Sequence, residues 1–273
     1  GRYHNLALAS DGSLWGWGHN SFGTVGDGTT VLQRTTPVRV HGAGNIGFLS
    51  DIKQISCGSH TSYALKNDGT VWAWGSNVTG RIGDNTITNR STPTPVHGPA
   101  NVGFLTGVTA IAGAGTHALA LKDDGTVWTW GTNLKGQLGD GTATSRWTPV
   151  QVVGVGGIGF LNDVVTLAGG GMHSWVMKSD GAVFAWGSNS GGQIGDNTSG
   201  LGADRATPVQ VHGQNNIGVL GNIIGVTSAV VGDQSFAIAD DGTLWGWGRD
   251  TSGQMGNGLP LLNELTPVPI AIP

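Results

Sequence analysis

The chain repeats one pattern of large apolar, small and polar residues five times. In each copy a large–small–large triplet, such as Leu119-Ala120-Leu121, is followed within three residues by Asp-Gly and then by a second alternating run, such as Val127–Gly131 (VWTWG). Residues i and i+2 of a β-strand share a face, and Gly accepts the positive φ of a hairpin turn. The pattern therefore predicts two antiparallel strands joined by a tight turn in every copy.

Each copy also holds a short apolar run ending in Gly, such as Val108–Gly115, and a Thr-Pro-Val segment, such as the one at Thr148. The Asp of Asp-Gly stands at positions 11, 68, 124, 180 and 241, which sets a period of 56 to 61 residues. Such a period with four short strands is typical of a propeller blade. We therefore predict an all-β chain of about nineteen strands, with no helix longer than a turn or two.

The predicted fold is a β-propeller of five repeat units, with four short antiparallel strands per blade and an incomplete first unit. The units are approximately residues 1–51, 52–107, 108–163, 164–223 and 224–273 of a single domain. Since the chain begins and ends within a unit, two arrangements stay open. Either the C-terminal strand Thr266–Ile272 shares a blade with the first unit and closes a ring, or the five units are cut from a longer array.

The tryptophans are the predicted core between blades. In the run that follows Asp-Gly, two aromatic residues flank one small residue, so one face of each blade is bulky and the other is flat. When the bulky face of one blade packs against the flat face of the next, the two sheets can reach the packing density of native proteins. We expect burial between blades, rather than an aromatic binding platform, for the second aromatic of each unit: Trp17, Trp74, Trp130, Trp186 and Trp247.

The stretch GTHALALKDDGTVWTWGTNLKGQLGDGT (Gly115–Thr142) resembles the repeat of the regulator of chromosome condensation family. The shared pattern is Gly-x-His before the alternating strand, then Asp-Gly, Trp-Gly-x-Asn, Gly-Gln-Leu-Gly and a Pro-Val strand, and it recurs in all five units. The resemblance implies a β-propeller, most often seven-bladed, so the five units here depart from the family. Resemblance to the founding member of the family implies guanine-nucleotide exchange on a small GTPase. That activity would need a long insertion, and no unit here carries one.

Composition narrows the function classes. The net charge of −4 argues against nucleic acid as a partner, and the single cysteine excludes an internal disulfide framework or a cysteine-based zinc site. No apolar run approaches membrane-spanning length, so we expect no membrane insertion. GVGGIG (Gly154–Gly159) lacks the strand–helix context of a dinucleotide site, and no cofactor is predicted. The low lysine content and the wealth of Thr, Asn and Gly favour a secreted or surface bacterial protein over a nuclear one.

The ionisable residues follow the repeat. Aspartates of the Asp-Gly turns and of the Gly-Asp loops stand where Asp bonds its own backbone, and each Gly-Asp loop brings only one carboxylate. A ring of imidazoles from His4, His60, His117 and His173 is a conceivable metal site, but repetition favours histidines bonded to backbone carbonyls. We therefore predict no catalytic residue, no metal site and no enzymatic activity.

The positions that differ between units are the predicted partner-binding residues. They lie in the loop that follows each Trp-Gly. The tips of these loops are expected on one rim of the propeller, where residues are not needed to hold the repeated fold. We expect a non-catalytic scaffold for an unidentified protein partner, with two alternatives: an exchange factor for a small GTPase, or an inhibitor of a secreted hydrolase, as in a bacterial β-lactamase inhibitor protein of this propeller type. The predicted contact residues are His19, Ser21, Phe22, Val78, Thr79, Leu134, Lys135, Arg249 and Asp250.

Overall fold

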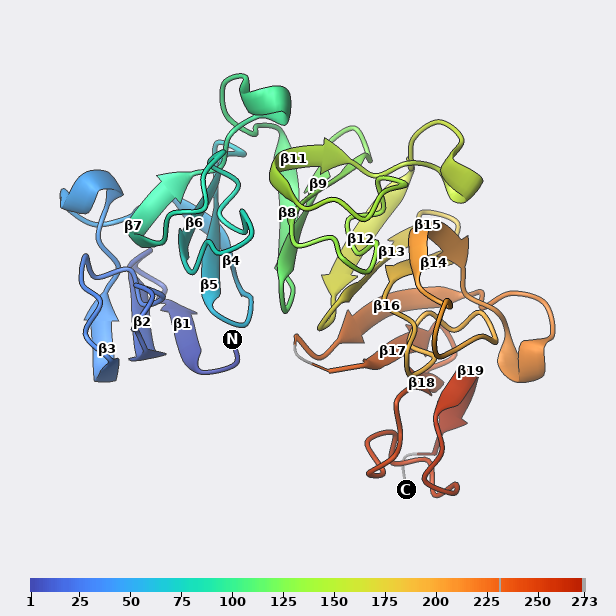
Figure 1. Ribbon diagram of the computed structural model, residues 1–273. Coiled ribbons are helices and arrows are strands. Elements are labelled where there is room, and N and C mark those ends of the chain that lie inside the picture. The colour runs from blue at the N-terminus through green and yellow to red at the C-terminus, as the bar shows by residue number, and fades with distance from the viewer. Residues whose placement is uncertain (231, 272–273) are drawn as a thin grey trace. The chain divides into compact units, whose positions relative to one another are not determined.

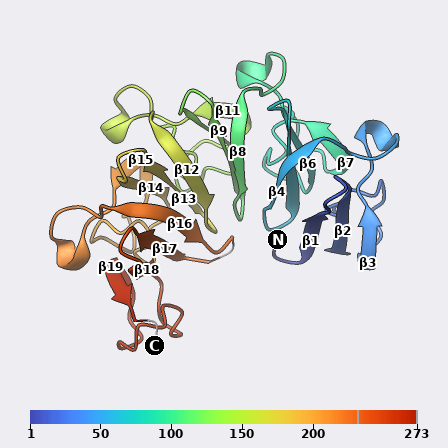
Figure 2. The same cartoon turned by 180° about the vertical axis from the view of Figure 1, so that it is seen from behind.

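A computed structural model describes residues 1–230 and 232–271. These residues form nineteen strands and four 3-10 turns, and they contain no α-helix (Figures 1 and 2). The predicted fold class is confirmed: the chain is all-β, with sheets of the propeller-blade type and an incomplete first blade.

Each sheet is made by one repeat, and its strands follow chain order. The first sheet has three strands, and the other four sheets have four strands each. The strands of the first two sheets are β1 (His4–Leu8), β2 (Leu14–His19), β3 (Gln33–Arg39), β4 (Ile52–Cys57), β5 (Thr61–Lys66), β6 (Val71–Gly75) and β7 (Arg90–Pro95). Those of the third and fourth are β8 (Val108–Gly113), β9 (His117–Lys122), β10 (Val127–Gly131), β11 (Arg146–Gln151), β12 (Val164–Gly169), β13 (His173–Lys178), β14 (Val183–Gly187) and β15 (Arg205–Gln210). The fifth sheet holds β16 (Ile223–Ser228), β17 (Gln234–Ala239), β18 (Leu244–Gly248) and β19 (Glu264–Ile270).

The hairpin predicted at each Asp-Gly is present. In the second sheet Thr61 pairs with Gly75 and Leu65 with Val71, so the two strands meet in an antiparallel register around the turn at Asp68. The carboxylate of Asp68 accepts the amide of Thr70 at 2.9 Å, which fixes the turn. The turn role expected of these aspartates is therefore confirmed.

The C-terminal strand completes its own sheet. Strand β19 pairs with β18 through Trp245 with Pro269 and Gly246 with Val268, which is the register that β15 makes with β14 in the fourth repeat. Among residues 1–230 and 232–271 the first sheet has three strands, and β19 is the fourth strand of the fifth sheet. Closure of a ring, with or without a shared blade, stays a prediction, as does the single domain.

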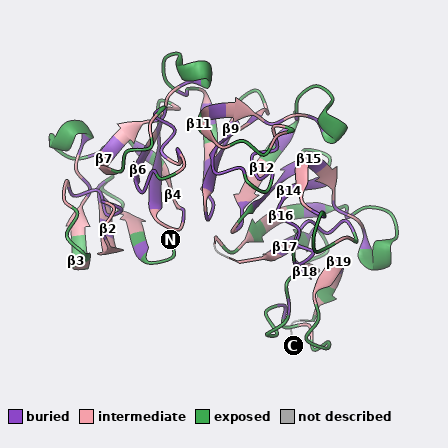
Figure 3. Ribbon diagram, in the orientation of Figure 1, coloured by how far each residue is buried: buried purple, intermediate pink, exposed green. Residues whose placement is uncertain are grey.

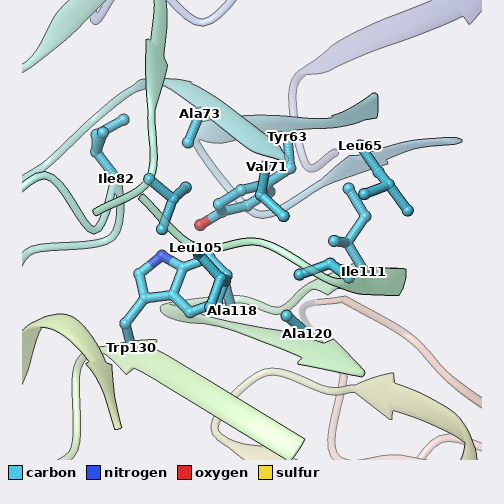
Figure 4. Packing of buried hydrophobic residues seen from close by; sticks show 12 residues of the cluster. Tyr63, Leu65, Val71, Ala73, Ile82, Leu105, Ile111, Ala118, Ala120 and Trp130 are labelled. Atoms are coloured by element: carbon cyan, nitrogen blue, oxygen red, sulfur yellow. The ribbon is translucent and has the colours of Figure 1, made fainter. Parts of the chain in front are cut away.

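The chain divides into two compact units. The first comprises residues 1–123, 128–132 and 145–150, and the second comprises residues 124–127, 133–144 and 151–273. In the first unit, a core of aliphatic and aromatic side chains fills the space between the second and third sheets, and Trp130 and Tyr63 point toward one another in it (Figure 4). In the second unit, Trp175 and Trp247 stack at 5.7 Å between the fourth and fifth sheets.

Four of the five predicted core tryptophans are fully buried, each against the repeat before its own. Trp74 shows the contact: its indole Nε1 donates to the carbonyl of Thr24 at 3.0 Å, and its ring lies on Gly26, where a Cβ would come within 2.6 Å of Nε1. The glycine of the Gly-Asp loop is therefore required by the tryptophan of the next repeat. Trp130, Trp186 and Trp247 make the same bond to Arg81, Gln137 and Gln193. Trp17 is only half-buried.

The recurring linker between repeats forms the 3-10 turns η1 (Ala43–Asn45), η2 (Pro99–Asn101), η3 (Val155–Gly157) and η4 (Gln214–Asn216). These turns stand out from the sheets and are exposed (Figure 3). Each linker ends in two adjacent apolar residues, of which only the second is buried. Leu105 is 2 % exposed, whereas Phe104 is 56 % exposed, since only the leucine points back to the sheet.

Candidate functional site

The candidate site consists of the loops that follow each Trp-Gly, which we call the post-WG loops, and one asparagine holds each loop in the first four repeats. In the second repeat Asn77 is fully buried, and its Oδ1 accepts the amide of Ile82 at 2.9 Å. Its Nδ2 donates to the carboxylate of Asp84 and to the carbonyl of Thr86, each at 3.0 Å. The loop is therefore shaped by side chain–backbone bonds, and its tip residues are free to vary.

An ion pair closes the base of the loop. Asp84 is 3 % exposed and lies 2.8 Å from Nε of Arg90, which begins the outer strand β7. Burial opposes ionisation of Asp84, but the bonds from Thr86 and Arg90 lower its pKa below the usual value. Equivalent pairs join Arg34 to Asp27 and Arg205 to Asp196. The sequence reasoning missed this partner, although Arg-x-Thr-Pro in four repeats was the signal for it.

The loop of the first repeat gathers aromatic rings. Phe22 and His19 lie 5.9 Å apart, and His60 lies 5.4 Å from Phe22 and 5.5 Å from Tyr3. Ser21, the third predicted residue here, bonds Nε2 of His19 at 2.9 Å. We call Tyr3, His19, Phe22 and His60 the aromatic cluster.

The aromatic cluster is partly exposed and lies beside a cation and a cavity. Tyr3 is 51 % exposed, and Arg2 lies over its ring at 4.9 Å. Burial, followed by the charges of His19, Arg81 and Arg2, lowers the pKa of His60, so its ring is neutral at physiological pH. A cavity of about 510 Å³ lies beside the cluster, and its lining includes Tyr3, Trp17, His19 and Arg34. The sequence indicated two of the four rings; Tyr3 and His60 come from other segments.

The second-repeat residues do not join this cluster. Val78 is 61 % exposed at its loop tip. Thr79 is half-buried, and its hydroxyl bonds that of Thr132 at 2.6 Å, so it links two repeats and contributes little free surface.

The predicted residues of the second unit separate into exposed and buried side chains. Leu134 is 73 % exposed, and the neighbouring Lys135 pairs with Asp204 at 3.0 Å. Arg249 lies 3.9 Å from Asp233 at the surface.

The prediction that Asp250 is a partner-binding residue on the rim is wrong, because its side chain is fully buried. It stands where the other repeats have the loop asparagine, and its Oδ1 accepts the amide of Met255 at 2.8 Å. It therefore belongs to the frame.

His4 and His173, two of the four histidines that precede the alternating strands, are structural, and each bonds a serine hydroxyl and not the expected backbone carbonyl. Nε2 of His4 lies 2.9 Å from the hydroxyl of Ser62, and Nε2 of His173 lies 3.2 Å from that of Ser235, so each bond joins one repeat to the next. Burial lowers the pKa of His173 to about 4, and burial together with nearby positive charge lowers that of His4 to about 3. Both rings are neutral at pH 7.

A search of the described residues finds no group of three His, Cys, Asp or Glu side chains placed to hold a metal ion. Within the same residues, no helix has the length and hydrophobicity needed to cross a bilayer.

The linker turns expose a second recurring surface that sequence reasoning missed. Ile46, Val102, Ile158 and Ile217 are between 75 % and 83 % exposed, one in each linker. Their signal was the apolar residue before the Gly in each of the recurring segments NIGFL, NVGFL, GIGFL and NIGVL.

The chain is similar to many known proteins, and three of them show the range of the likeness. Mouse E3 ubiquitin-protein ligase HERC2 is 31 % identical over 255 residues, which cover 93 % of this chain but only 5 % of that protein. Human WBSCR16 has a TM-score of 0.79 at 24 % identity, over 100 % of this chain and 66 % of the solved chain. Prp20p from Saccharomyces cerevisiae, described with its binding to Gsp1p and histones, has a TM-score of 0.68 at 19 % identity, over 100 % of this chain and 76 % of the solved one.

The family models match along the whole chain. The regulator of chromosome condensation (RCC1) repeat matches residues 11–65, 68–121, 124–177, 180–237 and 241–273, and a second model of the same repeat matches residues 52–81 and 108–137. The chain belongs to the regulator of chromosome condensation (RCC1) repeat family.

Proposed function

We propose that this chain is a non-catalytic module that binds a protein partner through its post-WG loops. The aromatic cluster of the first repeat carries the proposal. It holds four rings, each within about 6 Å of at least two of the others, beside an arginine and on a surface that is partly exposed. Aromatic and arginine side chains dominate the binding energy of protein interfaces.

The rigidity of the loops supports the proposal. The buried asparagine and the Asp–Arg pair fix the loops of the first, second and fourth repeats before a partner arrives, so little conformational entropy is lost on binding. The tips differ in chemistry: the first repeat offers rings, the second Val78, and the second unit Leu134, Lys135 and Arg249. Lys135 and Arg249 form exposed ion pairs with Asp204 and Asp233. Exposed ion pairs contribute little free energy, so both side chains can turn to a partner.

A non-catalytic role agrees with how the titratable groups are used. His4 and His173 are buried against serines, and the loop aspartates are bonded to their own loops. A general acid or base needs a tuned group within reach of a substrate, and these groups face the inside of the sheets and loops.

The partner is proposed to be a protein, because Prp20p is described with its binding to Gsp1p and histones. Exchange on a small GTPase and inhibition of a secreted hydrolase stay as alternatives. The composition that favours a secreted or surface bacterial protein is the support for the second alternative.

Binding assays with purified candidates test the proposal. A small GTPase loaded with fluorescent guanine nucleotide, core histones and a secreted β-lactamase are each titrated with the chain. The test variant carries Phe22→Ala, Lys135→Ala and Arg249→Ala, and the control carries Asn67→Ala and Asp123→Ala at the hairpin end of the blades. We expect affinity to fall at least tenfold in the test variant and to stay unchanged in the control.

Four results would change the conclusion. Binding lost only in the control would place the site on the opposite rim. Faster nucleotide release would favour the exchange factor, and loss of hydrolase activity would favour the inhibitor. Turnover of a substrate by the purified chain would refute the non-catalytic role.

A further inference from the structure

The post-WG loop of the fifth repeat departs from the frame at three linked positions. Asp250 replaces the asparagine, Asn257 replaces the aspartate of the Gly-Asp loop, and Glu264 replaces the arginine. The other repeats pair one negative with one positive side chain at the base of the loop, as in Asp84 with Arg90. The fifth repeat has two carboxylates and no cation at these positions.

The bonds that remain orient Asp250. Met255 N donates to its Oδ1 at 2.8 Å, which reproduces the bond from Ile82 N to Oδ1 of Asn77. Its Oδ2 consequently stands where the asparagine has its amide nitrogen. In the second repeat that nitrogen donates to two oxygens, the side-chain Oδ1 of Asp84 and the main-chain oxygen of Thr86.

In the fifth repeat a hydrogen-bond acceptor, Oδ2 of Asp250, takes the place of the donating amide nitrogen of the asparagine. The equivalents of those two oxygens are Oδ1 of Asn257, which accepts the amide of Leu259 at 3.0 Å, and the carbonyl of Leu259. Oδ2 of Asp250 has no hydrogen-bond partner and the residue is 0 % exposed. A buried carboxylate oxygen among acceptors is unfavourable unless a cation or a proton joins them.

Glu264 adds a second negative charge to the same place. Its carboxylate lies 3.4 Å from Nδ2 of Asn257, and burial, together with the charge of Asp250, raises its pKa. The neighbouring Arg249 does not neutralise them, because its guanidinium lies by Thr251 and Asp233.

We propose that the post-WG loop of the fifth repeat binds a divalent cation of the calcium type, with Oδ2 of Asp250, Oδ1 of Asn257, the carbonyl of Leu259 and the carboxylate of Glu264 as oxygen ligands. A divalent ion balances the two carboxylates. Calcium accepts mixed carboxylate, amide and main-chain oxygens in flexible geometry, with water completing the shell, whereas magnesium requires a near-ideal octahedron. The ion takes the place that the asparagine amide fills in the other repeats.

Thermal unfolding and calorimetry test the proposal on the whole chain. The protein is stripped with EDTA and titrated with CaCl2. We expect one saturable site and a melting temperature that rises by several degrees with calcium. Asp250→Asn restores the amide donor, so it should melt above the stripped wild type and show no calcium response. Asp123→Asn, which removes an exposed carboxylate elsewhere, should keep the response.

Glu264→Gln provides a second variant that leaves the buried loop residue in place, and its calcium affinity should fall at least tenfold. A wild type whose melting temperature and heat signal do not change with calcium would overturn the proposal and indicate a protonated Asp250. Calcium binding that persists in both Asp250→Asn and Glu264→Gln would also overturn it.

Discussion

At the residue scale, the contact between a tryptophan and the preceding repeat joins one blade to the next. The indole of Trp74 reaches a carbonyl 50 residues earlier in the chain and rests on a glycine of the same loop. Burial of such a ring is favourable only when its N–H finds an acceptor. The alternation of large and small residues predicted the buried ring, but it contained no information on the acceptor, because that atom belongs to another repeat.

Replacement of Trp130 by alanine is expected to lower the free energy of unfolding by about 3–5 kcal/mol, as large-to-small changes of buried aromatic residues do. The ring is fully buried, and its indole N–H is bonded to Arg81. Urea denaturation measures the effect. The matched control is Trp17→Ala, which removes a half-buried ring and should cost about half as much or less. Unchanged stability in Trp130→Ala together with loss of partner binding would show a binding platform instead of a core.

At the element scale, each post-WG loop is a small folded unit with its own polar core. Its shape depends on one asparagine, one aspartate and one arginine, and the arginine comes from the outer strand. Such loops keep their conformation while their tips vary, which is how one frame carries rings in the first repeat and Leu134 with Lys135 in the third.

Asn77→Ala is expected to cost about 2–3 kcal/mol, because it leaves the buried amide of Ile82 and a carboxylate oxygen of Asp84 without this partner. Hydrogen exchange at the amide of Ile82 should accelerate more than exchange in the strands of the same sheet. Asn67→Ala, at an exposed turn position, serves as the control. Equal protection of Ile82 in both variants would contradict the role assigned to Asn77.

Sequence alone predicted elements better than contacts between them. The strands, the Asp-Gly turns and the buried tryptophans follow from periods of two residues and of about 56 residues, which are local or repeated signals. The Asp–Arg pairs, the His–Ser bonds and the aromatic cluster are contacts between segments, and a repeated pattern does not state which side chains of two segments meet. Asp250 was assigned to the rim because it differs from the other repeats, yet it differs at a frame position.

At the scale of the whole molecule, successive repeats are held together by buried polar bonds as well as by apolar packing. His4 with Ser62 lies within the first unit and His173 with Ser235 within the second, so each unit depends on a neutral buried imidazole. This dependence makes the stability of the whole chain sensitive to acid.

The free energy of unfolding is therefore expected to fall between pH 7 and pH 5. Burial lowers the pKa of His173 to about 4, whereas an imidazole in the unfolded chain has its ordinary pKa of 6.5. As the pH drops below 6.5, the unfolded state takes up a proton that the native state excludes, so stability declines until the native pKa is reached. His173 alone should contribute a loss of about 2 kcal/mol at pH 5.

Urea denaturation at several pH values, compared with His173→Gln, measures this contribution. The variant starts from lower stability at pH 7, because the fitted imidazole is gone, but it should show a shallower pH dependence. The Cε1–H resonance of His173 in the native state should not titrate between pH 7 and pH 5.

Below the usual pKa of aspartate the free energy of unfolding falls further, because the pKa of Asp84 is lowered in the native state and its bonds to Thr86 and Arg90 disappear on protonation. An equal slope in wild type and variant would refute the assignment to His173 and leave acid sensitivity to the carboxylates alone.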